Sequence, residues 1–100
     1  MNINIVEEAI HEFYNNEKII RIDLNFKNNS NIHLYRNFID SISIYYESLK
    51  VFYTEQRYLN CTGIIRKSSQ SSINYYNIVD IIAITLINQS EIAENIDKQN

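Results

Sequence analysis

The sequence predicts an α+β fold, in which a small antiparallel or mixed sheet of about three strands carries helices packed on a face. Three observations lead to this class. Apolar residues recur at helical spacing near the N-terminus, alternate with polar residues in the next segment, and form a broad apolar run near the C-terminus. The predicted order is α-β-β-α-β-α. The 100 residues fit one domain, which we place at 1–97 with a frayed tail at 98–100.

The first predicted helix covers residues 3–15, with Asn2 as its N-cap. Polar residues fill the face opposite its apolar positions, as expected for a helix with one side against a core. Glutamates in its first turns suit the positive end of the helix dipole. The apolar positions, spaced three or four residues apart, are Ile3, Val6, Ile10, Phe13 and Tyr14.

Residues 18–26 change to a period of two, which predicts a half-buried strand with one wet face. The asparagine-rich segment 27–31 is the clearest turn signal in the chain. A short second strand at 32–35 then returns alongside the first.

Residues 36–57 fit two descriptions, of which we prefer a helix. An apolar face persists over several helical turns, and Arg36 and Asp40 would pair at i,i+4. The alternative is two strands, at 42–46 and 49–53, which β-branched and aromatic residues favour. That alternative needs tight turns near residues 40–41 and 47–48, where no Gly, Asn or Pro stands.

The remaining chain predicts a strand at 58–66, a polar linker at 67–72 and a helix at 73–88. Gly63 would mark a bulge or a close backbone approach within the strand. The last long helix is apolar nearly all round, and a short final helix follows at 90–96. Open sheet edges and this apolar helix would both be covered in a homodimer, which we therefore expect.

Composition excludes several classes of protein. The net charge is −3, which argues against a general nucleic-acid binder. The most apolar stretch, 75–87, is too short to span a membrane, and the N-terminus does not have the pattern of a signal peptide. With one cysteine, Cys61, no intramolecular disulfide can form, so we expect a reducing, cytoplasmic compartment. Abundant Ile, Asn, Tyr and Ser indicate an A+T-biased genome, for which a virus or mobile element is a natural source.

No catalytic, metal or cofactor site is predicted. One cysteine and two distant histidines supply too few zinc ligands, and Glu8, His11 and Glu12 fit a solvated helix face better than a metal site. A single glycine excludes the Gly-rich loops that hold phosphates and dinucleotides.

Two groups of residues are candidates for binding. Two cations and several hydroxyls precede the predicted 73–88 helix, whose free N–H groups would face the same anion: Arg66, Lys67, Ser68, Ser69, Ser71 and Ser72. Two tyrosine pairs lie in predicted helices, where one ring of each pair would remain at the edge of the core and anchor an interface. These candidate interface residues are Tyr45, Tyr46, Tyr75 and Tyr76.

The leading hypothesis is a non-enzymatic protein–protein interaction module, acting as an inhibitor, immunity protein, antitoxin-like partner or chaperone. Its acidic surface would meet a more basic target. One alternative is a nucleic-acid or nucleotide-phosphate binder that uses Arg66 and Lys67. A second alternative is a small enzyme with a site at a dimer interface, built on Cys61 or His33.

Overall fold

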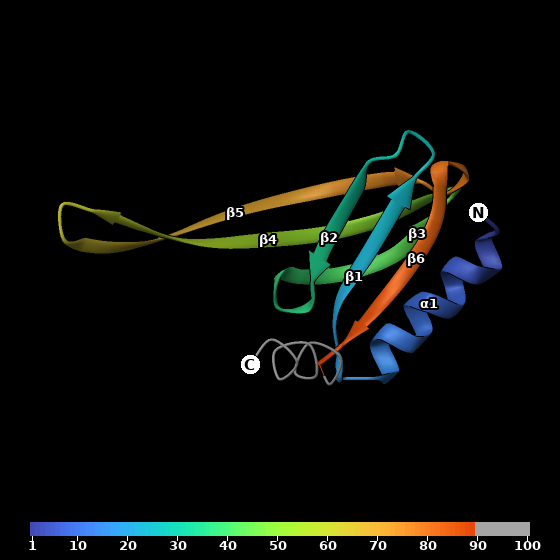
Figure 1. Ribbon diagram of the computed structural model, residues 1–100, viewed down its shortest axis with the longest axis horizontal. Coiled ribbons are helices and arrows are strands. Elements are labelled where there is room, and N and C mark those ends of the chain that lie inside the picture. The colour runs from blue at the N-terminus through green and yellow to red at the C-terminus, as the bar shows by residue number, and fades with distance from the viewer. Residues whose placement is uncertain (90–100) are drawn as a thin grey trace, which may run out of the picture.

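The computed structural model describes residues 1–89 and, within residues 59–61, only the backbone. The described chain is mostly sheet: a single helix precedes six strands, arranged in two antiparallel sheets of three (Figure 1). The predicted α+β class, with about three strands and helices packed on a face, is therefore wrong. The predicted helix at 90–96 and the tail at 98–100 lie outside the described residues.

The first sheet has the strand order β2-β1-β6, and the second has the order β3-β4-β5. Two single-turn 3₁₀ helices carry the chain between the sheets, one from β2 to β3 and the other from β5 to β6. The elements are α1 (Ile3–Asn15), β1 (Ile19–Phe26), β2 (Asn31–Tyr35), η1 (Arg36–Phe38), β3 (Ile39–Tyr45), β4 (Ser48–Cys61), β5 (Ile64–Asn77), η2 (Ile78–Asp80) and β6 (Ile81–Asn88).

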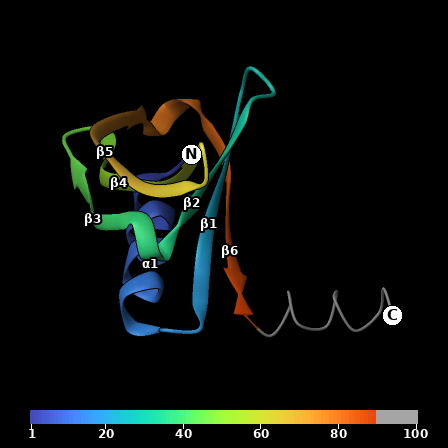
Figure 2. The same cartoon turned by 90° about the vertical axis from the view of Figure 1, so that its left-hand side faces the viewer.

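The core lies between the two sheets and α1. Figure 2 shows α1 on the side of β1 and β6 that faces the second sheet. Apolar side chains from the helix and from every strand but β5 are buried there, and they include those that have almost no exposed surface: Val6, Leu24, Leu49, Val51 and Ile81.

The predicted N-terminal helix is confirmed at residues 3–15. The side chain of Asn2 accepts a hydrogen bond from the Asn4 backbone N–H at 2.8 Å, so Asn2 is its N-cap. Strand β1 and strand β2 also match the predicted segments, and the turn between them places Asn29 at a φ of 67°.

The predicted helix at 36–57 is wrong, and the two-strand alternative describes this segment. Ile42, Leu49 and Val51 all point into the core, with Ile42 directly opposite Val51 and the β-branched side chains suited to a pleated sheet. The turn between the strands has Tyr46 at a φ of 54°, an uncommon conformation for a bulky residue. Tyrosine is not a typical residue for such a turn, so the sequence carries no turn signal at Tyr46.

The predicted single strand at 58–66 is interrupted by a turn: residues 58–61 end β4, and residues 64–66 begin β5. The predicted linker at 67–72 is wrong, because these residues continue β5 and pair with β4 in one long hairpin. Thr62 and Gly63 make its two-residue turn, with φ values of 55° and 79°. A Cβ on Gly63 would have no heavy atom within 4 Å, so its role is the positive φ and not a close approach.

The predicted helix at 73–88 is instead the end of β5, the η2 turn and β6. The segment is rich in isoleucine, whose branched side chain favours strands. The side chain of Asn77 accepts from the Val79 backbone N–H at 3.3 Å and starts the turn that divides the apolar run. The wide apolar face predicted for residues 73–88 therefore comes from two strands and not from one buried helix.

Candidate protein-binding surface

Three of the four candidate interface tyrosines come together on the outer face of the second sheet. Tyr45 ends β3, Tyr46 forms the turn, and Tyr75 lies on β5. The ring centroids of Tyr45 and Tyr46 are 4.6 Å apart, and those of Tyr45 and Tyr75 are 6.0 Å apart, both edge to face. All three are exposed, and Tyr46 has 81% of its surface accessible.

Lys50 lies close to the rings of Tyr45 and Tyr75. It lies directly opposite Tyr75 in the β4–β5 ladder, so both side chains are on the same face. Its Nζ atom is 5.1 Å from the ring centroid of Tyr45, 5.7 Å from that of Tyr75 and 4.9 Å from that of Phe52. No salt bridge of the described residues involves Lys50, so its ammonium group is offered to the surroundings. We call the set Tyr45, Tyr46, Lys50, Phe52, Ile73 and Tyr75 the aromatic patch.

Sequence reasoning missed the three members of the patch that are not tyrosines. Lys50 and Phe52 are two positions apart on β4, and Ile73 is two positions from Tyr75 on β5. The strand alternative for residues 36–57 would have placed Lys50 and Phe52 on one face, whereas residues 73–88 had no strand alternative that would pair Ile73 with Tyr75.

Tyr76, the fourth candidate, does not belong to the patch. As the next residue after Tyr75 it points to the opposite face of β5, where it packs against the core and lies 5.8 Å from the Phe26 ring. Burial raises the pKa of its hydroxyl above the ordinary value of 10.0. It is a half-buried residue at the edge of the core, on the face opposite the aromatic patch.

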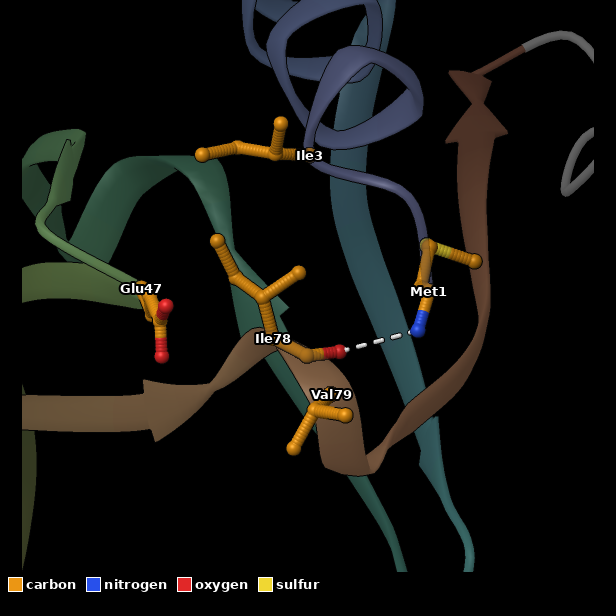
Figure 3. A pocket seen from close by; sticks show the side chains of 5 residues that line it. All are labelled: Met1, Ile3, Glu47, Ile78 and Val79. Atoms are coloured by element: carbon orange, nitrogen blue, oxygen red, sulfur yellow. Dashed lines mark hydrogen bonds between the residues drawn. The ribbon is translucent and has the colours of Figure 1, made fainter.

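A shallow hollow adjoins the patch on the far side of the Tyr46 turn. Its volume is about 300 Å³, and it is lined by Met1, Ile3, Glu47, Ile78 and Val79 (Figure 3). The amino group of Met1 donates to the Ile78 carbonyl at 3.2 Å, and Glu47 supplies the charged side chain of the wall. The mainly apolar walls suit contact with an apolar side chain better than chemistry on a polar substrate.

The candidate anion site depends on the N-terminus of a helix that begins at residue 73, and the structure has strand β5 there instead. Residues 66, 67, 71 and 72 lie within β5, so no helix N-terminus faces them. Arg66 and Lys67 are neighbours in a strand and project to opposite faces. The hydroxyls are also occupied, since Ser71 Oγ lies 3.1 Å from Thr54 Oγ1 and Ser72 Oγ accepts from Asn74 at 3.1 Å.

The histidine of the proposed enzyme alternative belongs to a polar cluster on the first sheet. Nδ1 of His33 lies 2.6 Å from Oδ1 of Asp23, its cross-strand neighbour. Arg21 donates to both oxygens of the same carboxylate, at 2.8 and 3.0 Å. Desolvation raises the pKa of Asp23, but the hydrogen bonds from Arg21 and His33 outweigh it and hold the pKa below 3.8.

The two residues named for that alternative are on different elements. β4 ends at Cys61, at the far end of the long hairpin, whereas His33 is on β2 (Figure 1). Within the described part of the chain, no group of three or more His, Cys, Asp or Glu side chains is arranged to hold a metal ion. No helix among residues 1–89 is long and apolar enough to cross a membrane.

Comparisons with models of protein families, with curated proteins and with solved structures give no match for this chain. Its function is therefore inferred from the fold and the surfaces described above.

Proposed function

We propose that this protein is a small non-enzymatic interaction module that binds another protein through the aromatic patch. The observation that carries the proposal is the gathering of three exposed tyrosines on a sheet face, two of them beside the ammonium group of Lys50. Tyrosine supplies a large contact area with few rotatable bonds, and it is enriched among the residues that dominate binding energy at interfaces. A sheet holds these side chains in fixed positions, which lowers the entropic cost of binding.

Charge indicates the chemistry of the partner. The β4–β5 hairpin, residues 48–77, carries four cations and one carboxylate, a net charge of +3 that leaves −6 on the rest of the chain. The patch therefore belongs to the positive part of an acidic protein. We propose a partner that presents a carboxylate to Lys50 among apolar groups, the reverse of the basic target expected from net charge alone.

The conformation of Tyr46 supports a functional role for the turn. A left-handed conformation costs a non-glycine residue about 1–2 kcal/mol, and glycine or asparagine would adopt it more easily. Tyr46 has little packing to offset this cost, since most of its surface is exposed. Strained backbone conformations are concentrated at functional sites, and this supports a binding role for the exposed ring of Tyr46.

The proposed module fits the role of an inhibitor, an immunity protein, an antitoxin-like partner or a chaperone. The identity of its partner would show which of these roles it has. A photo-crosslinking amino acid at position 46 or 75, expressed in the native host, would identify that partner. The matched control carries the same group at Tyr35, an exposed tyrosine on the first sheet. The proposal expects one protein to be captured from positions 46 and 75 and not from position 35.

Binding of the purified pair then tests the patch directly. Tyr46→Ala and Tyr75→Ala should each weaken binding by roughly 30-fold, the effect of losing about 2 kcal/mol at an interface anchor. Lys50→Glu should weaken it further, because it repels an acidic partner. Tyr35→Ala should leave the dissociation constant unchanged. Equal effects of the variants at 35, 46 and 75, or tighter binding by Lys50→Glu, would refute the proposal.

A further inference from the structure

The outer part of the β4–β5 hairpin projects from the body of the protein, away from both the core and α1 (Figure 1). We call residues 56–69 the arm. Its described side chains are exposed on both faces, including Tyr58 at 70% and Ile65 at 71%. An isolated two-stranded ribbon is at best marginally stable in water. Exposed apolar residues on such a ribbon indicate that another surface covers it.

The arm is also positively charged. Arg57, Arg66 and Lys67 lie on it, and the sequence has no carboxylate between Glu55 and Asp80. The one salt bridge that the structure shows here joins Arg57 to Glu55 at 3.3 Å, with both side chains largely exposed. Lys67 lies directly opposite Tyr58, and Ile65 is two positions away, so these three side chains share one face.

The exposed face of α1 has the complementary pattern. It carries Glu7, Glu8 and Glu12, and no lysine or arginine occurs in the helix. Glu8 and Glu12 are one turn apart, where like charges repel and destabilise a helix. Ile5, half exposed, stands one turn before Glu8 on the same side. The helix therefore offers an apolar residue followed by carboxylates, which complements the face of the arm that carries Tyr58, Ile65 and Lys67.

We propose that the arm of one molecule binds the acidic face of α1 on a second copy of this chain. The arm of a molecule cannot reach its own helix, because the two lie at opposite ends of the longest dimension of the molecule, which is 48 Å (Figure 1). Two copies related by a two-fold axis would form this contact twice and close into a dimer. The aromatic patch is not part of the contact, so the dimer and the proposed partner site are independent.

Charge reversal with mixing tests this contact. The arm variant is Lys67→Glu, and the helix variant is Glu8→Lys/Glu12→Lys. Each is measured by analytical ultracentrifugation over a range of protein and salt concentrations. The matched control, Lys27→Glu, makes the same change in net charge as the arm variant at an exposed lysine elsewhere. Circular dichroism confirms that each variant is folded.

The wild type and the control should dimerise, more weakly as salt rises. Each charge-reversed variant alone should dimerise roughly tenfold or more weakly, and an equimolar mixture of the two should recover a heterodimer, because unlike charges then meet at both contacts. A monomeric wild type, a dimer unaffected by arm reversal, or a mixture that fails to associate would overturn the proposal. A monomer that binds random-sequence duplex DNA through the arm would also overturn it, in favour of a nucleic-acid ligand.

Discussion

Arg36 gives the most direct test of how this fold is held together. Its guanidinium group lies between α1 and the first sheet, where it donates hydrogen bonds to the backbone carbonyls of Phe13, Asn16 and Ile19. The same group stacks on the Phe13 ring, 3.9 Å from the centroid. A cation at this end of the helix also meets the negative end of the helix dipole. One side chain thus joins the end of the helix to the start of β1.

Replacing Arg36 with alanine should lower the free energy of unfolding by about 2–4 kcal/mol. A hydrogen bond from a charged donor contributes about 1.5–3 kcal/mol, and a cation–π contact adds about 0.5–2 kcal/mol. The total stays below the sum of these contributions because the site is half-buried and water can reach some of the released carbonyls. Arg36→Lys should lose about half as much, since one ammonium cannot span three carbonyls.

Urea unfolding followed by circular dichroism measures these values by linear extrapolation. Arg57→Ala is the matched control, because Arg57 pairs with Glu55 on an exposed strand and should contribute less than about 1 kcal/mol. If Arg36→Ala unfolds within about 0.5 kcal/mol of the wild type, the arginine does not join the helix to the sheet as described.

Three further predictions follow from individual contacts. The Tyr14 hydroxyl donates to the Ile42 carbonyl and accepts from the Ile42 N–H. Tyr14→Phe removes both hydrogen bonds and should lower the free energy of unfolding by about 1–3 kcal/mol. A free energy equal to that of the wild type in urea unfolding would contradict this. Asp23 has a pKa below 3.8 when folded, so its contribution to stability is present above about pH 4 and lost as pH falls further. Asp23→Asn should therefore be less stable than wild type at pH 7 and should flatten the acid side of the stability profile, whereas an unchanged profile would contradict this. Tyr46→Gly should leave the unfolding free energy within about 1 kcal/mol of wild type, because relief of strain offsets lost ring contacts, while it weakens partner binding by roughly 30-fold, as Tyr46→Ala does. A large loss of stability would show that the ring is structural.

The local elements that the sequence predicted well have signals within a few residues of one another. Helix α1 has an N-cap at Asn2 and a full apolar face, and β1 has strict alternation followed by an asparagine-rich turn. Capping, helix period and strand period depend on neighbouring residues, so they can be recognised without the rest of the fold. The chemistry of tyrosine identified the three tyrosines of the aromatic patch as candidates, although the two predicted helices that would carry them are strands and turns in the structure.

The segments that were predicted wrongly depend on contacts between distant parts of the chain. Residues 36–57 fit a helix and two strands almost equally well by period, and residues 73–88 were predicted as a helix from their broad apolar face; pairing of β3 with β4 and of β1 with β6 decides for strands. The turn at Tyr46 has no glycine or asparagine to announce it. A strand is stable only when a partner strand satisfies its backbone hydrogen bonds, and the partner is not visible from local sequence.

The sequence by itself determined the N-terminal helix, the first hairpin and the excess of exposed aromatic and polar side chains. The tertiary structure decided that Tyr45, Tyr46 and Tyr75 gather on one sheet face with Lys50 while Tyr76 packs against the core, and that the cations of residues 57–67 project on an arm. Cross-strand register sets which side chains share a face, and a shift of one residue would exchange the two faces. Register arises from packing of the whole sheet, and for that reason the aromatic patch became visible only in the folded chain.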